Sequence, residues 1–377
     1  MEKISVIGIG KLGLCFGLSL EGAGYDVVGV DINESYVKAI NDKTFNSSEA
    51  HVNDILRISK NFHATTDLNS AIRHSDVIFV VVATPSLPNG RYNHAQIESL
   101  RDNLLALGKQ EQPKHLIINC TTMPGYCAIL QEQMSDNNWT ISYNPEFIAQ
   151  GTIIVNQENP DMVLIGEANA EIGDRLQKIY ETMTKNDPRI HRMSPTEAEI
   201  TKISLNCFLT TKIAYTNMIG DIVLASGGDP QVVLNAVGSD TRVGTKLTRY
   251  GFGYGGPCFP RDNRAIGIYA KDIGLPADIS SATDDMNAKH LQFQIDQFVS
   301  NNSKETKVSF GDCLESDRVV YENVTYKKGS TMIEESQQLA FAAALAKNGY
   351  AVRIYDCQEV IDSVRAQHGD IFEYVEV

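Results

Sequence analysis

The chain has 377 residues, 42% of them hydrophobic, which is too long for one ordinary core and predicts two or three domains. Its formal net charge of −14 argues against a surface for nucleic acid or anionic membranes, because such surfaces present excess Lys and Arg. Its seven cysteines are odd in number and widely spaced, which is not typical of a disulfide framework and indicates a reducing, cytoplasmic environment.

The N-terminal stretch KISVIGIGKLGLCFGLSLEGAG predicts a strand, a turn and a helix. Its glycines, and the acidic Glu2 before it, distinguish it from a secretory leader. The chain carries no run of 18 or more apolar residues, so no transmembrane helix is expected.

Strand-like apolar runs alternate with helical stretches through the first half of the chain. The runs are ISVIGIG, YDVVGVD, SDVIFVVVATP, HLIINCTT, WTISYNPEF and DMVLIGE. Continuous β-branched runs separated by helices predict a parallel sheet buried on both faces. We therefore expect a Rossmann-like, doubly wound α/β domain over residues 1–193.

From Pro195 to about Lys271 the strand signals disappear. Apolar residues at helical spacing predict one long central helix, with Ser194 or Thr196 as its N-cap and acidic residues in its first turn. We expect residues 194–295 to form a helical domain.

The last segment, residues 296–377, follows the linker candidate NNSKETK. It contains VVYENVTY, a helical stretch SQQLAFAAALAKNG and the strand-like AVRIYD, which together predict a strand, a helix and a strand. We expect a short C-terminal α/β domain.

The motif GIGKLG places Gly8, Gly10 and Gly13 in the pattern G-x-G-x-x-G, directly after a strand and at the start of a helix. Asp31 ends the next strand, close to the spacing of about 20 residues expected for the acid that binds the adenosine ribose. Since that acid would repel a 2′-phosphate, the pattern favours NAD over NADP. The alternative is that the glycines only allow tight packing in a doubly wound sheet.

The stretch GYGGPCFPRDN concentrates glycine and proline around Cys258. Glycines permit the close approach of a ligand, and prolines stiffen the chain that presents the cysteine. The alternative is a small buried residue in a turn, since a free cysteine is more often part of a core than a nucleophile.

Three polar residues elsewhere are also candidates. Lys202 and Asn206 lie one helical turn apart on the predicted central helix and face the same way, although a solvated helix face is the usual meaning of such a pair. Glu146, in NPEF, follows a strand, where ligands of open α/β sheets gather. Its alternative is an acid in a surface turn.

Several of these stretches, in the same order, resemble the UDP-glucose/GDP-mannose dehydrogenase family of NAD-dependent nucleotide-sugar 6-dehydrogenases. The most specific is GYGGPCFPRD, against the family pattern G-[FY]-G-G-x-C-[FL]-P-K-D. The others, NPEFIAQG, CTTMPG, ITKISLNCF and TRVG, match N-P-E-F-L-x-E-G, S-T-V-x-P-G, x-x-K-x-x-x-N-x-F and Q-R-I-G. The resemblance runs from residue 1 to about 290 and is weaker beyond.

This resemblance implies oxidation of a sugar C6 alcohol to a carboxylate in two hydride transfers, through a covalent cysteine intermediate. It implies that Cys258 is the nucleophile, that Glu146 activates the hydrolytic water and that Lys202 stabilises the developing oxyanion. Asn206 would hold the reacting end of the sugar. The implied catalytic set is Cys258, Lys202, Asn206, Asp262, Glu146 and Thr121.

The resemblance also implies the ligand contacts. Asp262 and Thr121 would position water and the proton-transfer chain. The implied NAD contacts, with no metal, are Gly8, Gly10, Lys11, Leu12, Gly13, Asp31, Thr84, Thr121, Gln150 and Lys327. The implied contacts to the nucleotide sugar are Phe147, Lys202, Asn206, Arg242, Tyr250, Gly253 and Gly255. Arg242 resembles an arginine that reaches the sugar of a neighbouring subunit, which implies a homodimer formed through the central helix.

The chain departs from the family pattern at several of these places. Arg261 replaces a lysine, Gln150 an acid and Met162 an arginine, and Tyr36 stands where many members carry an arginine near the adenosine. In YKKGSTMIEES, Glu334 replaces an arginine that usually contacts the cofactor. The C-terminal domain also stops after about one βαβ unit, where the family's domain normally runs longer.

The resemblance points first to oxidation of UDP-glucose to UDP-glucuronate for polysaccharide biosynthesis. Other UDP-hexoses, UDP-N-acetylhexosamines and GDP-mannose stay open as substrates. The alternatives are a two-electron NAD-dependent hydroxyacid dehydrogenase, which would use Lys202 and Asn206 without a cysteine, and a non-catalytic relative that binds nucleotide sugars.

Overall fold

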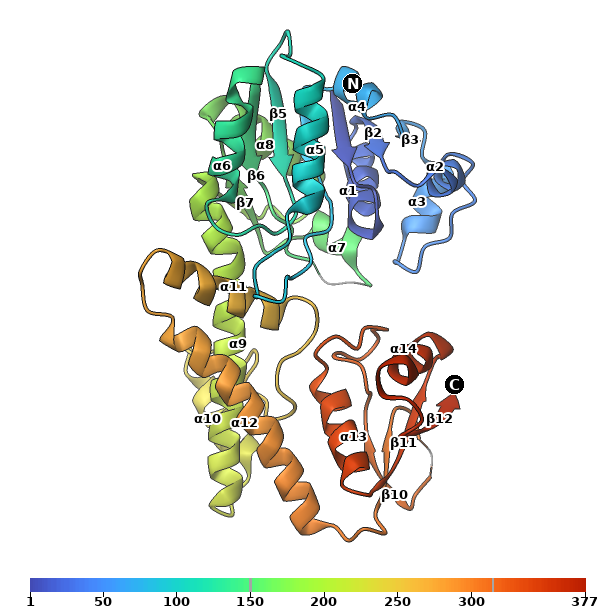
Figure 1. Ribbon diagram of the computed structural model, residues 1–377, viewed down its shortest axis with the longest axis vertical. Coiled ribbons are helices and arrows are strands. Elements are labelled where there is room, and N and C mark those ends of the chain that lie inside the picture. Colours follow the sequence, from blue (N-terminus) through green and yellow to red (C-terminus); the bar gives the residue numbers. More distant parts are fainter. Residues whose placement is uncertain (149–150, 314) are drawn as a thin grey trace. The chain divides into compact units, whose positions relative to one another are not determined.

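The structure, a computed structural model, describes residues 1–148, 151–313 and 315–377. The chain divides into two compact units, Met1–Lys202 and Ile203–Val377, whose helices and strands are labelled in Figure 1. The finer division into domains at residues 1–193, 194–295 and 296–377 stays a prediction.

The first unit is built on an eight-stranded sheet of order β3-β2-β1-β4-β5-β6-β7-β8. Its strands are β1 (Lys3–Ile7), β2 (Asp26–Val30), β3 (Phe62–Thr65), β4 (Val77–Val80), β5 (Lys114–Ile118), β6 (Trp139–Tyr143), β7 (Met162–Gly166) and β8 (Arg189–Met193). All six strands expected from apolar runs are present, and β3 and β8 extend the sheet at its two edges.

One pairing differs from the parallel sheet that the sequence predicts. Strands β6 and β7 pair antiparallel, through Tyr143 and Gly166, whereas the other neighbours are parallel. Parallel neighbours need a long crossover, usually a full helix. The connection from β6 to β7 carries only the six-residue helix α7 (Ile153–Glu158), so the chain returns in the opposite direction.

Helices cover both faces of this sheet. They are α1 (Lys11–Gly22), α2 (Glu34–Asn41), α3 (Val52–Ile58), α4 (Leu68–His74), α5 (Ala95–Ala106), α6 (Tyr126–Met134), α7 and α8 (Ala170–Met183), with a 3-10 turn at Ser135–Asn137. Val6 of β1 is buried in one core with residues of α1 and α8, whereas Ile7 is buried in a second core with residues of α5 and α6. This alternation confirms that the sheet is buried on both faces.

The long helix α9 (Pro195–Ala225) has 31 residues and confirms the predicted central helix. Ser194 caps its start. The backbone N–H and the hydroxyl of Ser194 both donate to Oε2 of Glu197, at 2.8 and 2.6 Å. The acid in the first turn therefore satisfies groups that the helix leaves open at its N-terminus.

The second unit combines helices with a four-stranded parallel sheet of order β10-β9-β11-β12. Its strands are β9 (Lys307–Phe310), β10 (Arg318–Tyr321), β11 (Ala351–Asp356) and β12 (Glu373–Glu376). Its further helices are α10 (Pro230–Ser239), α11 (Phe259–Asp272), α12 (Asp278–Asn301), α13 (Gln337–Lys347) and α14 (Gln358–His368). The predicted strand, helix and strand are present as β10, α13 and β11.

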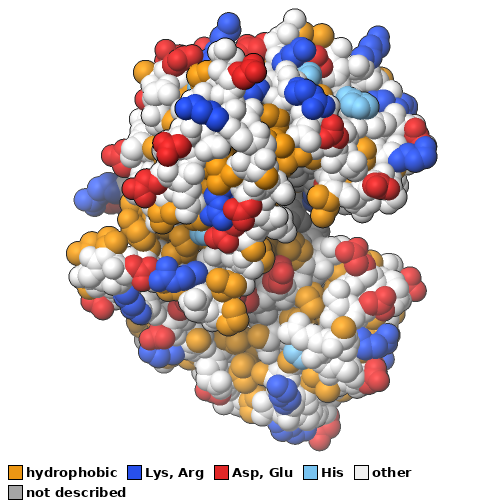
Figure 2. Space-filling view, turned by 45° about the horizontal axis from the view of Figure 1, so that its top comes forward, with side chains coloured by type: hydrophobic (Ala, Val, Ile, Leu, Met, Phe, Trp, Pro, Cys, Tyr) orange, Lys and Arg blue, Asp and Glu red, His pale blue; other side chains and the backbone are white. Residues whose placement is uncertain are grey.

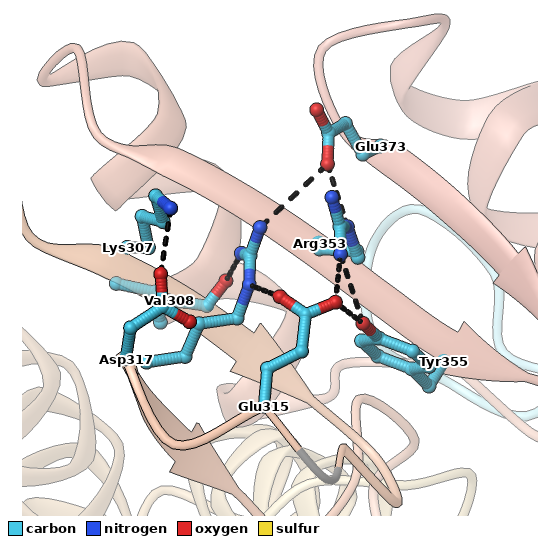
Figure 3. Close-up of polar contacts among 8 residues, drawn as sticks. Lys307, Val308, Glu315, Asp317, Arg353, Tyr355 and Glu373 are labelled. Carbon is cyan, nitrogen blue, oxygen red and sulfur yellow. Dashed lines mark hydrogen bonds and ion pairs between the residues drawn. The ribbon is translucent and has the colours of Figure 1, made fainter.

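The two faces of the small sheet differ in chemistry. Phe310 and Ile354 are buried in a core with residues of α12 and α13. On the other face Glu315 binds both Arg318 and Arg353, at 2.7 and 2.5 Å, and Arg353 also binds Glu373 at 2.6 Å (Figure 3). The Arg318 side chain is only 4% exposed, whereas the carboxylates of Glu315 and Glu373 that pair with it are 43% and 63% exposed.

The surface drawn in Figure 2 carries positive and negative side chains interspersed. Among the described residues, no helix combines the length and the apolar character that a membrane crossing requires.

Candidate active site

The glycine turn between β1 and α1 has the geometry that its sequence predicts. Gly8 has φ +87°, and a Cβ there would lie 2.5 Å from the Val81 carbonyl oxygen. A Cβ on Gly13 would lie 2.0 Å from the Gly8 carbonyl oxygen, so this glycine lets α1 pack directly on the turn. A Cβ on Gly10 would meet no protein atom within 4 Å.

This turn fits a dinucleotide. Gly10 is the N-cap of α1, where no side-chain hydrogen bond caps the start of the helix, and a Cβ there would meet open space. Such a helix N-terminus favours phosphate. The Leu12 side chain packs against the apolar core. A pocket of about 270 Å³ lies alongside, lined by Gly10, Lys11, Leu14, Tyr36, Phe45, Asn46, Ser47 and Ser48.

Asp31 and Tyr36 lie near this pocket. Asp31 directly follows β2, and its carboxylate accepts a hydrogen bond from Asn33 N at 3.1 Å. The Tyr36 hydroxyl donates to the Ile9 carbonyl at 2.7 Å, which holds the aromatic ring against the glycine turn. Lys11 lies 3.9 Å from Glu49. An acid and an aromatic ring therefore stand where the adenosine end of a dinucleotide is expected.

Thr84 and Thr121 follow β4 and β5 and are brought together. The Thr84 hydroxyl donates to the Thr121 carbonyl at 2.7 Å. Both residues lie at the carboxyl ends of parallel strands, which is the edge where ligands of open α/β sheets bind. The predicted contact Gln150 lies outside the described residues.

Glu146, Phe147 and Lys202 form a second group in this unit. The Lys202 ammonium donates to the Glu146 carbonyl at 2.5 Å and lies 4.3 Å from the centre of the Phe147 ring. Burial raises the pKa of the Glu146 carboxyl to about 7, although Asn119 and the charge of Lys202 favour its ionised form. A carboxyl with this pKa exchanges protons readily near neutral pH.

The residues that form a hydrogen-bond network next to Glu146 were not predicted from the sequence. The Tyr180 hydroxyl donates to Asn144 Oδ1 at 2.7 Å and lies 3.5 Å from Glu146 Oε1. Asn119 Nδ2 donates to the Asn144 carbonyl at 2.6 Å. The quoted NPEF motif contains Asn144, which was a signal for this network, whereas nothing local marks Asn119 or Tyr180.

Glu199 is a second residue that the sequence did not single out. It is fully buried on α9, and its carboxylate accepts hydrogen bonds from Thr122 Oγ1, Gly125 N and Cys127 N at 2.9, 2.6 and 2.9 Å. It thereby ties the loop that carries Thr121 to the helical turn just before Lys202.

The second unit presents Cys258 at the N-cap of α11, with Pro260 in the first turn of that helix. Cys258 is exposed, whereas Cys15, Cys120 and Cys127 are buried. The rigid turn therefore holds this sulfur at the surface of its unit.

Asp262 lies one turn along α11 from Cys258, and its N–H donates to the Cys258 carbonyl at 2.9 Å. Its buried carboxylate accepts a hydrogen bond from Asn206 Nδ2 at 2.6 Å. Cys207 Sγ donates to the Asp262 carbonyl at 3.3 Å. The second unit thus brings Asn206, Asp262 and Cys258 together.

The expected substrate contacts of the second unit differ in their surroundings. A Cβ on Gly253 would lie 2.1 Å from Asn287 Oδ1, and one on Gly255 would lie 2.3 Å from the Glu335 carbonyl oxygen. The Tyr250 hydroxyl donates to Asp221 at 2.7 Å, which leaves its backbone as the group that can meet a ligand.

Arg242 and Lys327 both lie at the surface of this unit. The Arg242 guanidinium pairs with Asp240 at 2.8 Å, and its side chain is 86% exposed. Lys327 follows β10 with an exposed side chain, and its carbonyl accepts a hydrogen bond from Thr325 Oγ1 at 3.0 Å.

The sheet, the glycine turn and the residues at the strand ends define an NAD-binding oxidoreductase, and comparison with known proteins gives the family. Residues 2–184 match the NAD-binding domain, and residues 196–289 the central domain, of the UDP-glucose/GDP-mannose dehydrogenase family. The chain belongs to this family of NAD-dependent nucleotide-sugar dehydrogenases, and NAD is its cofactor.

Individual relatives support this family assignment. The chain is 28% identical over 390 residues to a GDP-mannose 6-dehydrogenase of Pseudomonas savastanoi pv. phaseolicola, covering 99% of this chain and 84% of that protein. It is 29% identical over 308 residues to the UDP-glucose 6-dehydrogenase TuaD of Bacillus subtilis, covering 79% of this chain and 66% of that protein. The fold is similar to a UDP-glucose dehydrogenase structure from Pyrobaculum islandicum, with TM-score 0.86, 24% identity and coverage of 100% and 86%.

Proposed function

We propose that this protein oxidises the C6 alcohol of a nucleotide sugar to a carboxylate in two steps, with UDP-glucose as the first candidate substrate. The observation that carries the proposal is the exposed thiol of Cys258 at the N-cap of α11, one turn from the buried Asp262. Relatives named for GDP-mannose and for UDP-glucose are about equally similar to the chain, so the base of the nucleotide is left to experiment.

NAD, held at the glycine turn, supplies the hydride acceptor for both oxidations. The Cys258 sulfur adds to the carbon of the aldehyde, and the carbonyl oxygen takes up a proton, which gives a thiohemiacetal. Loss of a hydride and of the hydroxyl proton leaves a thioester. Water then breaks the carbon–sulfur bond, which returns the thiol and releases the carboxylate. Because the aldehyde stays bonded to sulfur, it does not leave between the two oxidations.

Glu146 is suited to activate the hydrolytic water, because a carboxyl with a pKa of about 7 accepts a proton near neutral pH and can give it up again. Lys202 places a positive charge beside Glu146, where it would stabilise the oxyanions formed on the substrate. Asn206 would hold the reacting end of the sugar. Asp262 and Thr121 would position water and the groups that transfer protons.

We also propose a cytoplasmic homodimer formed through the central helix. The side chains of Phe208, Tyr215 and Ile222, spaced seven residues apart on α9, are 68%, 55% and 54% exposed, and Val232 of α10 is 67% exposed. An apolar stripe of this kind is typical of a protein–protein interface. Arg242, which is exposed, would then be offered to the sugar bound by the other subunit.

The test is the yield of NADH per sugar, measured with purified protein, excess NAD⁺ and limiting amounts of several UDP- and GDP-sugars. We expect two NADH for each molecule of the true substrate and a uronate as product. One NADH per sugar would point to a simple alcohol oxidation. No NADH with any sugar, despite NAD binding, would favour a non-catalytic relative.

A further inference from the structure

A buried histidine–aspartate pair contacts the glycine-rich segment 250–256 of the second unit. His290 of α12 is fully buried, and its Nδ1 lies 2.9 Å from both carboxylate oxygens of Asp221 on α9. Its Nε2 lies 2.7 Å from the Gly251 carbonyl oxygen. The imidazole thus connects the long helix to the backbone of the segment.

The two ring nitrogens of His290 face two different groups. Nδ1 faces the Asp221 carboxyl group and Nε2 faces the Gly251 carbonyl, so the ring links these two groups directly. The other groups that face the pair are the Tyr250 hydroxyl, which donates to Asp221 at 2.7 Å, and Gln294 Nε2, which lies 3.3 Å from the Gly251 carbonyl oxygen.

The segment needs such an anchor. A glycine has no side chain to fix the orientation of its peptide planes, and Gly251 and Gly253 alternate with Phe252 here. Asn217 Oδ1 accepts a hydrogen bond from Gly251 N at 3.2 Å, and Asn287 binds both the N–H and the carbonyl of Tyr254, at 3.0 and 2.9 Å.

These bonds all come from α9 and α12, so they fix the side of the segment that faces the two helices. The N–H and carbonyl groups of Gly253 and Gly255 themselves are not among the groups bonded in this way, and Gly256 N donates to the Glu334 carbonyl at 2.9 Å. A ligand with both donors and acceptors, such as the diphosphate and hydroxyl groups of a nucleotide sugar, would meet the segment through these groups.

We infer that His290 and Asp221 form a positioning pair, which fixes the Gly251 peptide plane so that the rest of the segment is pre-organised for the nucleotide sugar. This inference rests on the proposed function. Pre-organisation reduces the ordering cost of binding, so loss of the pair weakens substrate binding more than it slows chemistry. NAD binding, which belongs to the glycine turn of the first unit, is unaffected.

The test uses His290→Gln, Asp221→Asn and the double variant, with Lys289→Gln on the exposed side of α12 as the matched control. Hydrogen–deuterium exchange of peptides covering 250–256 is measured together with the KM for the nucleotide sugar, kcat and the Kd for NAD. We expect faster exchange in this segment and a KM raised at least about tenfold in His290→Gln, with kcat changed less. The double variant recovers part of the loss, because it leaves no uncompensated buried charge.

Two results would overturn the inference. One is His290→Gln with wild-type exchange over 250–256 and wild-type KM, whatever its thermal stability, since the pair would then be a structural contact only. The other is Asp221→Asn with wild-type exchange over 250–256, since the carboxylate would then not help to hold the ring against the segment. Hydrogen–deuterium exchange over 250–256 needs no turnover, so a wild-type protein that oxidises no sugar would refute the proposed function and leave the positioning of the segment to be decided by exchange.

Discussion

Asn206 Nδ2 lies 2.6 Å from Asp262 Oδ2, so an amide on α9 and a buried carboxylate on α11 hold one another in place one turn from Cys258. In the proposed function both residues take part in the reaction. Asp262→Asn keeps the size of the side chain and an oxygen that can accept from Asn206, so it should fold as the wild type does.

The Asp262→Asn variant removes the negative charge that we propose positions water and protons. We expect kcat to fall roughly 100-fold, with a melting temperature within a few degrees of the wild type. Steady-state kinetics and a thermal melt measure both. A wild-type kcat would remove Asp262 from the catalytic set.

Lys202→Ala tests the oxyanion role. The lysine contacts the Glu146 carbonyl and the Phe147 ring, and its charge is needed most when negative charge develops on the substrate. We expect a loss of about 100-fold or more in kcat and a much smaller change in the KM for the sugar nucleotide. Lys178→Ala, on the exposed face of α8, is the control. Equal losses in binding and rate would contradict the role.

Glu146→Gln tests the carboxyl whose pKa burial raises from an ordinary value of 4.5 to about 7. A carboxyl of this kind binds its proton more tightly in the folded state. It therefore contributes stability that is complete below its unfolded pKa and is lost as the pH rises through about 7.

We expect the stability of the wild type relative to Glu146→Gln to fall by an amount on the order of 2 kcal/mol between pH 5 and pH 8. Denaturant melts at several pH values measure this difference. In activity, uronate formation by the wild type should rise as Glu146 loses its proton, and Glu146→Gln should accumulate the thioester. A pH-independent stability difference would argue against the raised pKa.

Alanine substitutions at Gly10 and Gly13 separate cofactor binding from stability at the glycine turn. In Gly13→Ala the new methyl would meet the Gly8 carbonyl oxygen, so we expect a loss of about 2 kcal/mol in the free energy of unfolding. In Gly10→Ala the methyl points into open space, so stability should change by only a few tenths of a kcal/mol while NAD binding weakens at least about tenfold. The reverse order of effects would contradict the assigned roles.

The interior of the large sheet was predictable because its strands are continuous apolar runs. The edge strands β3, FHAT, and β8, RIHRM, were not, since each is short and half polar, which is typical of loops as much as of strands. The antiparallel pairing of β7 depends on the short connection before it, and no local pattern marks it.

The candidate site likewise contains residues that local sequence predicts and residues that it does not. Glycines and a cysteine in an unusual context identified the turn and Cys258 from local sequence. Glu199 and Tyr180 act through partners distant in the chain, Thr122 and Asn144, and each looks like an ordinary helix residue in sequence. Contacts of this kind are set by tertiary packing, which single-sequence patterns do not describe.

We propose that Cys258 carries the substrate through the second oxidation. The NADH yield and product of Cys258→Ser, with limiting nucleotide sugar and excess NAD⁺, test this role. Cys357→Ser is the matched control, because Cys357 also stands at a helix N-cap, that of α14. We predict two NADH and a uronate from the wild type and the control, and at most one NADH with no uronate from Cys258→Ser. Two NADH per sugar and full uronate production by Cys258→Ser would contradict the account.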